Sequence, residues 1–137
     1  MNHSRHAVPR LSYDPTVHRG PGDYLTNVLI EYTLFPNTNL MWAIDHFEVY
    51  RVEPIGGRPD RSRVRLTLLV DPATAGCVER WEKNLEIARR VIVSEDFAAA
   101  RSIQRALDGG AAPPEFVLGR NEAPLQHYHR RLDAHWS

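Results

Sequence analysis

The stretch RVRLTLLVDP, residues 63–72, decides the fold because the hydrophobic period changes where it ends. Within it apolar and polar side chains alternate: Val64, Leu66, Leu68 and Val70 against Arg63, Arg65 and Thr67. Strict alternation predicts a strand with one face against a core. Beyond Asp71-Pro72 the apolar residues recur at helical spacing, at Trp81, Leu85, Ala88 and Ile92. A strand followed directly by an amphipathic helix favours an α+β fold.

Two further strands are expected upstream. Residues 28–34 alternate, and the Pro and Asn residues of 35–39 supply turn chemistry. A second strand is predicted from about Leu40 to Val52, and its slip in alternation at 45–47 is interpreted as a bulge or an edge position. With a turn at 55–60, the three strands form an antiparallel meander. Residues 1–24, which contain several Pro and Gly residues, are expected to be irregular.

Two more helices are expected downstream. Ser94-Glu95-Asp96 resembles a fresh helix start, and Gly109-Gly110 would end that helix. Residues 111–119 are expected to form a loop. Asn121 is expected to cap a last helix, which presents Leu125, Tyr128, Leu132 and Trp136 on one face.

Composition excludes several classes of function. The 137 residues suit one domain, and 17 basic residues balance 17 acidic ones, so no global charge attracts nucleic acid or an anionic membrane. Cys77 is the only cysteine, which rules out an internal disulfide and a cysteine-held metal cluster. No stretch resembles a signal peptide or a membrane span, so a cytoplasmic location is expected.

Three groups of residues are candidates for chemistry. Asp96 is either an acid stabilised by a helix N-terminus or a metal ligand held at a fixed angle by that helix. His127 and His129 are two apart on a helix and cannot chelate one metal, so they are expected on a solvated or subunit-facing surface. His3 and His6 could share a helical face, but their segment has no helical period.

Short segments from five regions of the chain together resemble the catalytic domain of Rieske-type, aromatic-ring-hydroxylating oxygenase α subunits. In order they are His3-Ser4-Arg5, Leu34-Phe35-Pro36-Asn37, Glu53-Pro54, Ser94-Glu95-Asp96 with Ile103-Gln104-Arg105-Ala106-Leu107, and Leu118-Gly119-Arg120-Asn121-Glu122 with Leu125-Gln126-His127-Tyr128-His129. The resemblance covers nearly the whole chain and implies a helix-grip (Bet v1/START-like) fold. It indicates a partial domain, the C-terminal portion of the catalytic domain, over residues 1–137.

The resemblance also implies a cofactor. Such oxygenases bind mononuclear Fe(II) through two histidines and one carboxylate, and Asp96 matches the carboxylate, eight positions before Gln104. The paired histidines and the Rieske domain with its 2Fe-2S cluster have no counterpart in the chain. The leading hypothesis is therefore a truncated or split dioxygenase component that is inactive alone. Its expected partners are an aromatic or apolar small molecule, other oxygenase subunits, and an electron-donating ferredoxin or reductase.

Two alternatives stay open. One is a non-catalytic helix-grip module that binds an apolar small ligand in the cavity between sheet and helix, with Asp96 only a helix-start residue. The other is an assembly role, in which an uncovered sheet face or edge pairs with another copy of the chain or with a partner.

Overall fold

A single antiparallel sheet forms one layer of the molecule. We describe it from a computed structural model of residues 3–111, 115 and 117–136, in which Tyr24 is described by its backbone alone. Its five strands lie in sequence order: β1 (His3–Pro9), β2 (Val28–Leu34), β3 (Thr38–Trp42), β4 (His46–Ile55) and β5 (Arg58–Val70). The α+β expectation is confirmed, with more strands than the three that the sequence indicated.

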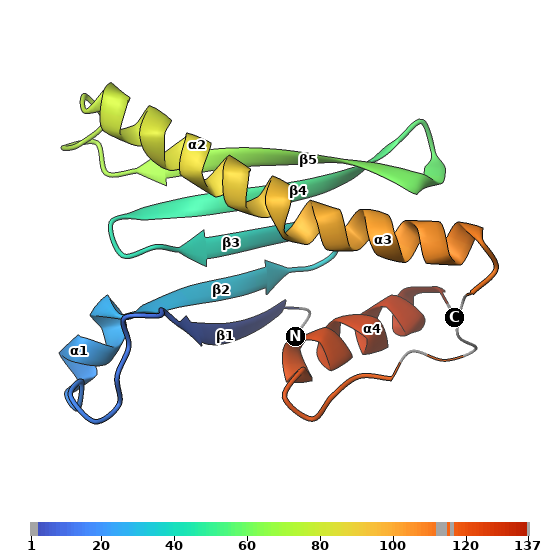
Figure 1. The fold of residues 1–137 in the computed structure, drawn as a ribbon, viewed down its shortest axis with the longest axis horizontal. Coiled ribbons are helices and arrows are strands. Elements are labelled where there is room, and N and C mark those ends of the chain that lie inside the picture. The colour runs from blue at the N-terminus through green and yellow to red at the C-terminus, as the bar shows by residue number, and fades with distance from the viewer. Residues whose placement is uncertain (1–2, 112–114, 116, 137) are drawn as a thin grey trace.

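The helices provide the second layer. Figure 1 shows α2 and α3 almost end to end across one face of the sheet, with α4 beside β1 near the opposite margin. Their bounds are α1 (Pro21–Thr26), α2 (Val78–Ser94), α3 (Asp96–Asp108) and α4 (Ala123–Trp136). None of the helices described is long and apolar enough to cross a membrane.

The predicted break between α2 and α3 is confirmed. The helix ends at Ser94, Glu95 is the intervening cap, and Asp96 opens α3. Gly109 ends α3 as expected, since its N–H bonds the carbonyl of Arg105. The start of α4 differs: it begins at Ala123, so Glu122 rather than Asn121 precedes it. In the expected loop at 111–119, residues 112–114 and 116 lie outside the described residues.

The expectation of an irregular first segment was wrong. Residues His3–Pro9 form β1, which pairs with β2 over seven residue pairs, and Pro21–Thr26 form α1. The sequence of β1, HSRHAVP, has no apolar alternation. Backbone hydrogen bonding to β2, rather than side-chain burial, makes it a strand, as suits a position at the edge of a sheet.

The second expected strand is in fact two. The chain reverses between β3 and β4 at residues 43–45, where Ile44 has φ of +75°. The amide of Ala43 donates to the carbonyl of His46 and closes this turn. The slip in alternation near Asp45 therefore marks a hairpin, not a bulge within one strand.

Strand pairing decides which side chains face the helices. His6, Glu31, Met41, Glu48 and Leu68 lie opposite one another across the five strands. Because alternate side chains of a strand share a face, this row lies on the opposite face from the apolar set at Val28, Ile30, Tyr32 and Leu34. The side that α2 and α3 cover is therefore the more polar face of β2.

The buried hydrophobic core is small. In the described part of the chain it consists of Val28, Ala43 and Trp81. Many large apolar side chains on both layers remain at least a third exposed. The sheet and helices consequently enclose open space rather than a filled core.

Candidate functional site

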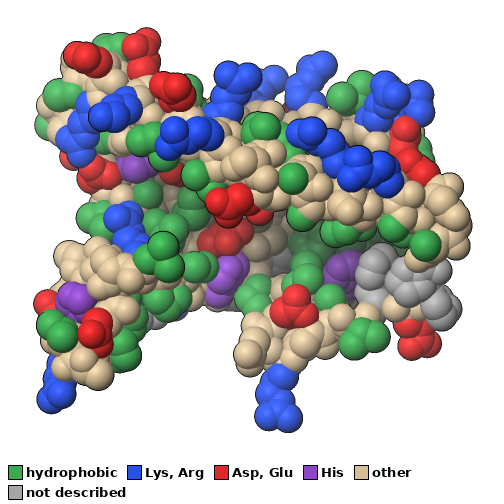
Figure 2. Space-filling view, viewed as in Figure 1, with side chains coloured by type: hydrophobic (Ala, Val, Ile, Leu, Met, Phe, Trp, Pro, Cys, Tyr) green, Lys and Arg blue, Asp and Glu red, His purple; other side chains and the backbone are tan. Residues whose placement is uncertain are grey.

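A hollow of about 990 Å³ lies between the sheet and α2–α3. Its sheet side includes Glu31, Met41, Glu48 and Tyr50, and its helix side includes Ile87, Val91, Phe97 and Asp96. We call it the helix-covered hollow. Figure 2 shows acidic and histidine side chains gathered at the centre of this face, beside the α2–α3 layer. In this hollow, polar side chains of the strands lie close to an acidic side chain of the helices.

Asp96 lines this hollow from the first residue of α3. The break after α2 gives α3 its own N-terminus, whose unpaired N–H groups favour a carboxylate. Glu95, its neighbour, has no side-chain capping bond and is absent from the lining of the hollow. Of these two adjacent acids, Asp96 is the one that borders the space between sheet and helices.

The sheet side of the hollow carries a row of polar residues on β4. His46, Glu48 and Tyr50 alternate along the strand, so their side chains share one face. The Tyr50 hydroxyl donates to Oε2 of Glu48. His46 Nε2 lies 3.5 Å from the other Glu48 oxygen, Oε1. The side chains of His46 and Glu48 are only 9% and 12% exposed.

The row continues toward the margin of the sheet. His46 Nδ1 lies 2.7 Å from Oδ1 of Asp45, and Asp45 Oδ2 accepts from the guanidinium of Arg80 on α2. Arg80 also lies over the ring of its neighbour Trp81, 4.6 Å from its centroid. Trp81 packs against the imidazole of His46 and donates its indole N–H to the carbonyl of Thr74 at 2.8 Å. The contacts of Arg80 with Asp45 and of Trp81 with His46 therefore hold α2 against the β3–β4 turn.

The potential inside the hollow is negative near Tyr50. Burial raises the pKa of Tyr50, and the hydrogen bond to Glu48 and the charges of Glu48, Asp96 and Glu31 raise it further. At the turn, the hydrogen bond with His46, and then the charges of His46 and Arg80, lower the pKa of Asp45. Tyr50 therefore stays a hydrogen-bond donor, and Asp45 stays a carboxylate, across the physiological range.

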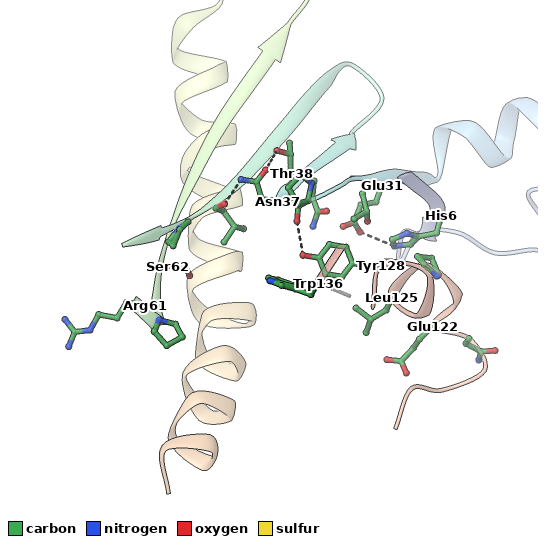
Figure 3. A pocket seen from close by; sticks show the side chains of 18 of the residues that line it. His6, Glu31, Asn37, Thr38, Arg61, Ser62, Glu122, Leu125, Tyr128 and Trp136 are labelled. Carbon is green, nitrogen blue, oxygen red and sulfur yellow. Dashed lines mark hydrogen bonds and ion pairs between the residues drawn. The ribbon is translucent and has the colours of Figure 1, made fainter. Parts of the chain in front are cut away.

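A second hollow, of about 1020 Å³, lies between the sheet and α4 and shares Glu31, Asn39 and Val52 with the first. Figure 3 shows His6 pointing at Glu31 across the β1–β2 pair, with Nε2 and Oε2 3.1 Å apart. On α4, the Tyr128 hydroxyl donates to the carbonyl of Pro36 at 2.8 Å. We call this space the α4 hollow. It extends the helix-covered hollow along the same face of the sheet.

The histidines considered from the sequence do not form a metal site. His3 and His6 lie on a strand, where residues three apart face opposite sides, so they share no helical face. His3 instead accepts a hydrogen bond from the Phe35 amide at 3.1 Å. His127 and His129 lie on α4, as expected.

Iron coordination would need more ligands than this part of the chain offers. Among the described residues no three His, Cys, Asp or Glu side chains are grouped to hold a metal ion. A facial iron site takes two imidazoles and a carboxylate. Asp96 could supply the carboxylate, but the described residues around it do not supply the other ligands of such an iron site.

The sequence interpretation missed the row His46–Glu48–Tyr50. Polar residues at a period of two were visible there, but on a strand they ordinarily indicate a solvated face. In the structure α2 and α3 cover that face, and the three polar side chains therefore line a hollow.

Comparison with known proteins gives one result. The model of the family described as ring hydroxylating alpha subunit (catalytic domain) matches residues 4–137. No curated protein and no solved structure matches the chain. Because the match covers nearly the whole sequence, the chain belongs to the family of ring-hydroxylating α-subunit catalytic domains.

Proposed function

We propose that the chain is part of the catalytic domain of a dioxygenase that hydroxylates aromatic or apolar molecules with O2, and that Asp96 is its ligand to a mononuclear Fe(II). The observation that carries this proposal is the position of Asp96 at the tip of α3, bordering the hollow between helices and sheet. A carboxylate is one of the three ligands that such an iron site needs.

The other two ligands would come from outside this chain. Asp96 belongs to no group of three possible metal ligands among the described residues, so we propose that another segment or polypeptide supplies the two imidazoles. Bound Fe(II) would supply O2 activation, with electrons from a ferredoxin or reductase through a Rieske centre on that other part. On this proposal the isolated chain is inactive.

The helix-covered hollow suits an apolar substrate body. Ile87, Val91 and Phe97 face it from the helices, and Met41 and Val52 face it from the sheet. Concave, largely apolar spaces with a few polar groups are the usual form of small-molecule sites. These side chains would hold the ring beside Asp96 and exclude water from it.

The half-exposed apolar surface supports association with other oxygenase subunits. Phe47 and Leu69, on the face of the sheet away from α2–α3, are 36% and 52% exposed. Exposed apolar groups that cluster on one face commonly mark a protein interface. Copies of this chain, or the segment that supplies the imidazoles, would cover them.

The test is whether iron uptake depends on Asp96 when imidazole is supplied. Fe(II) would be measured by anaerobic equilibrium dialysis against the chain with free imidazole present. We expect Asp96→Asn to weaken uptake at least about tenfold, because loss of even an outer-shell partner has effects of that size. The matched control is Glu95→Gln, which removes the adjacent acid outside the hollow and should leave uptake unchanged.

Equal uptake by the wild type and Asp96→Asn would contradict the proposal. The result would favour the second candidate, a non-catalytic module that binds an apolar ligand. The size and apolar helix side of the helix-covered hollow support that candidate independently of any metal.

A further inference from the structure

The helix-covered hollow and the α4 hollow lie on the same face of the sheet and meet along it. Alternate residues of β4 line them in order: Glu48 lies in the first hollow, Val52 in both, and Pro54 in the second. At about 3.4 Å per residue, Glu48 and Pro54 are about 20 Å apart along the strand. A molecule lying on this face can therefore extend from one hollow into the other.

Different helices cover the two ends of this face. Val91 and Phe97 supply apolar contacts over the helix-covered hollow, and Leu125 does so over the α4 hollow. Figure 3 shows Tyr128 and Trp136 in the space between α4 and the strands. The Tyr128 hydroxyl holds α4 there, because it donates to a carbonyl of the β2–β3 turn at 2.8 Å. Each hollow can thus hold an apolar group.

A row of neutral polar side chains crosses the sheet where the two hollows meet. Ser4, Thr33 and Asn39 lie opposite one another on β1, β2 and β3. All three residues are half-buried, and Asn39 lines both hollows. Ser4 Oγ is enclosed without a hydrogen-bond partner. Within the described part of the chain the side chains of Thr33 and Asn39 also form no hydrogen bond, so their donors and acceptors are free to bind a ligand.

The basic side chains of the α4 hollow, and Glu31 beside them, have partners within the chain. Oε2 of Glu31 lies 3.1 Å from Nε2 of His6. Arg58 binds the carboxylate of Asp60 through two nitrogens, and Nε of Arg61 lies 3.7 Å from the same carboxylate. A ligand at the meeting point of the hollows therefore needs no charge to compensate these groups.

A carboxamide beside a hydroxyl suits a neutral group that both accepts and donates hydrogen bonds. Asn39 offers two N–H donors and a carbonyl acceptor, and the hydroxyl of Thr33 can do either. A secondary amide has one carbonyl and one N–H, so it can bond to both side chains in place of water. A purely apolar linker would bury Asn39 without a hydrogen bond, which is unfavourable.

We propose that the two hollows together bind one elongated, uncharged molecule, in which two apolar or aromatic groups are joined by a secondary amide held by Thr33 and Asn39. As an assignment of the substrate this inference rests on the function proposed above; as an assignment of a binding site it does not. Asn39 selects the linker, and Val52 decides whether a ligand can occupy both hollows.

The experiment compares three uncharged probes. N-benzylbenzamide has two rings joined through an amide, 1,3-diphenylpropane has the same number of atoms between its rings but no amide, and N-methylbenzamide keeps the amide with a single ring. Dissociation constants for the full chain would be measured by NMR titration. We expect N-benzylbenzamide to bind about 10- to 100-fold more tightly than N-methylbenzamide, because a second ring of the size of a phenylalanine side chain is buried.

Two variants test the linker site. The measured quantity is the ratio of the affinities for N-benzylbenzamide and 1,3-diphenylpropane, in which effects common to both ligands cancel. We expect Asn39→Leu to lower this ratio at least about tenfold and Thr33→Val to lower it about threefold. Thr67→Val makes the same change as Thr33→Val at an exposed position on the opposite face of the sheet and should leave the ratio unchanged.

Val52→Trp tests whether one ligand occupies both hollows. A large side chain at their meeting point should weaken the binding of N-benzylbenzamide at least about tenfold. Val49→Trp, on the other face of β4, is the matched control and should leave it unchanged. In the wild type, intermolecular NOEs should connect one ring of the probe with α4 and the other ring with α2 or α3.

No binding of N-benzylbenzamide, or an affinity ratio unchanged in both Asn39→Leu and Thr33→Val, would overturn this inference. So would equal losses in Val52→Trp and Val49→Trp, or NOEs from both rings to one hollow alone. Iron uptake through Asp96 uses none of these side chains, so Asn39→Leu should leave it unchanged. Failure of the amide site and failure of the proposed function can therefore be told apart.

Discussion

The hydroxyl of Tyr50 donates a hydrogen bond to the Glu48 carboxylate two residues earlier on β4. Both side chains face the space between sheet and helices, and Glu48 is among the few buried residues of the described chain. The pair shows that the polar face of this strand is turned inward. It also makes the stability of the sheet depend on a buried charge.

Tyr50→Phe should destabilise the fold. The substitution removes the donor to Oε2 and leaves a buried carboxylate without a hydrogen bond. We expect the free energy of unfolding in urea to fall by about 1–3 kcal/mol. Tyr32→Phe, on the opposite face of β2, is the control and should change it by less than about 0.5 kcal/mol.

The double variant Tyr50→Phe/Glu48→Gln should lose less stability than the sum of its single changes, because the uncompensated charge is gone. Strict additivity, or no loss in Tyr50→Phe, would show that the two side chains do not interact in solution.

Trp81, the one aromatic residue of α2, should be sensitive to truncation. Its side chain is buried against His46, and its indole donates to Thr74. We expect Trp81→Ala to lower the free energy of unfolding by about 3–5 kcal/mol. Trp136→Ala makes the same chemical change at a side chain that is 81% exposed and should have little effect. Similar losses in both variants would contradict this placement of α2 on the sheet.

Asp45 should contribute stability that depends on pH. Its pKa in the folded state is lowered from 3.8, so its contribution is present above pH 3.8 and is lost as the pH falls through the folded value. At pH 7, Asp45→Asn should be less stable than the wild type by up to about 1 kcal/mol, because the carboxylate is half-exposed and screened.

The difference between Asp45→Asn and the wild type should shrink as the pH falls below 3.8. Urea unfolding over this range measures it. Glu86→Gln, at an exposed position of α2, is the control. A deficit that stays constant to low pH would mean that the charge of Asp45 is not responsible.

Part of the fold was predictable from the sequence because its signals were local. The alternation of residues 63–70 and the helical period from Trp81 both correspond to observed elements, β5 and α2. The break at Ser94-Glu95-Asp96 was equally clear. By contrast, β1 depends on pairing with a strand distant in sequence, and the β3–β4 turn depends on a positive φ at Ile44, which an isoleucine does not signal.

The position of Asp96 beside the hollow was predictable from the sequence, whereas the positions of Glu48 and Tyr50 were not. The resemblance to the oxygenase family singled out Asp96 of the two adjacent acids at a helix start, and the helix carries it to the edge of the hollow. Its role as a metal ligand stays a prediction. Glu48 and Tyr50 could not be assigned, because the face of a strand that becomes interior is decided by the helices that cover it. That choice is a tertiary property, and the polar alternation of β4 favoured the wrong side.

The central claim is that Asp96 is the carboxylate of this chain that binds a metal at the helix-covered hollow. Paramagnetic broadening of backbone amide NMR signals by Mn(II), which shares the preference for oxygen ligands, detects even weak binding. We expect broadening centred on residues 95–97 and extending to Tyr50 across the hollow. It should vanish in Asp96→Asn and persist in Glu95→Gln. Broadening centred elsewhere, or unchanged in Asp96→Asn, would contradict the claim.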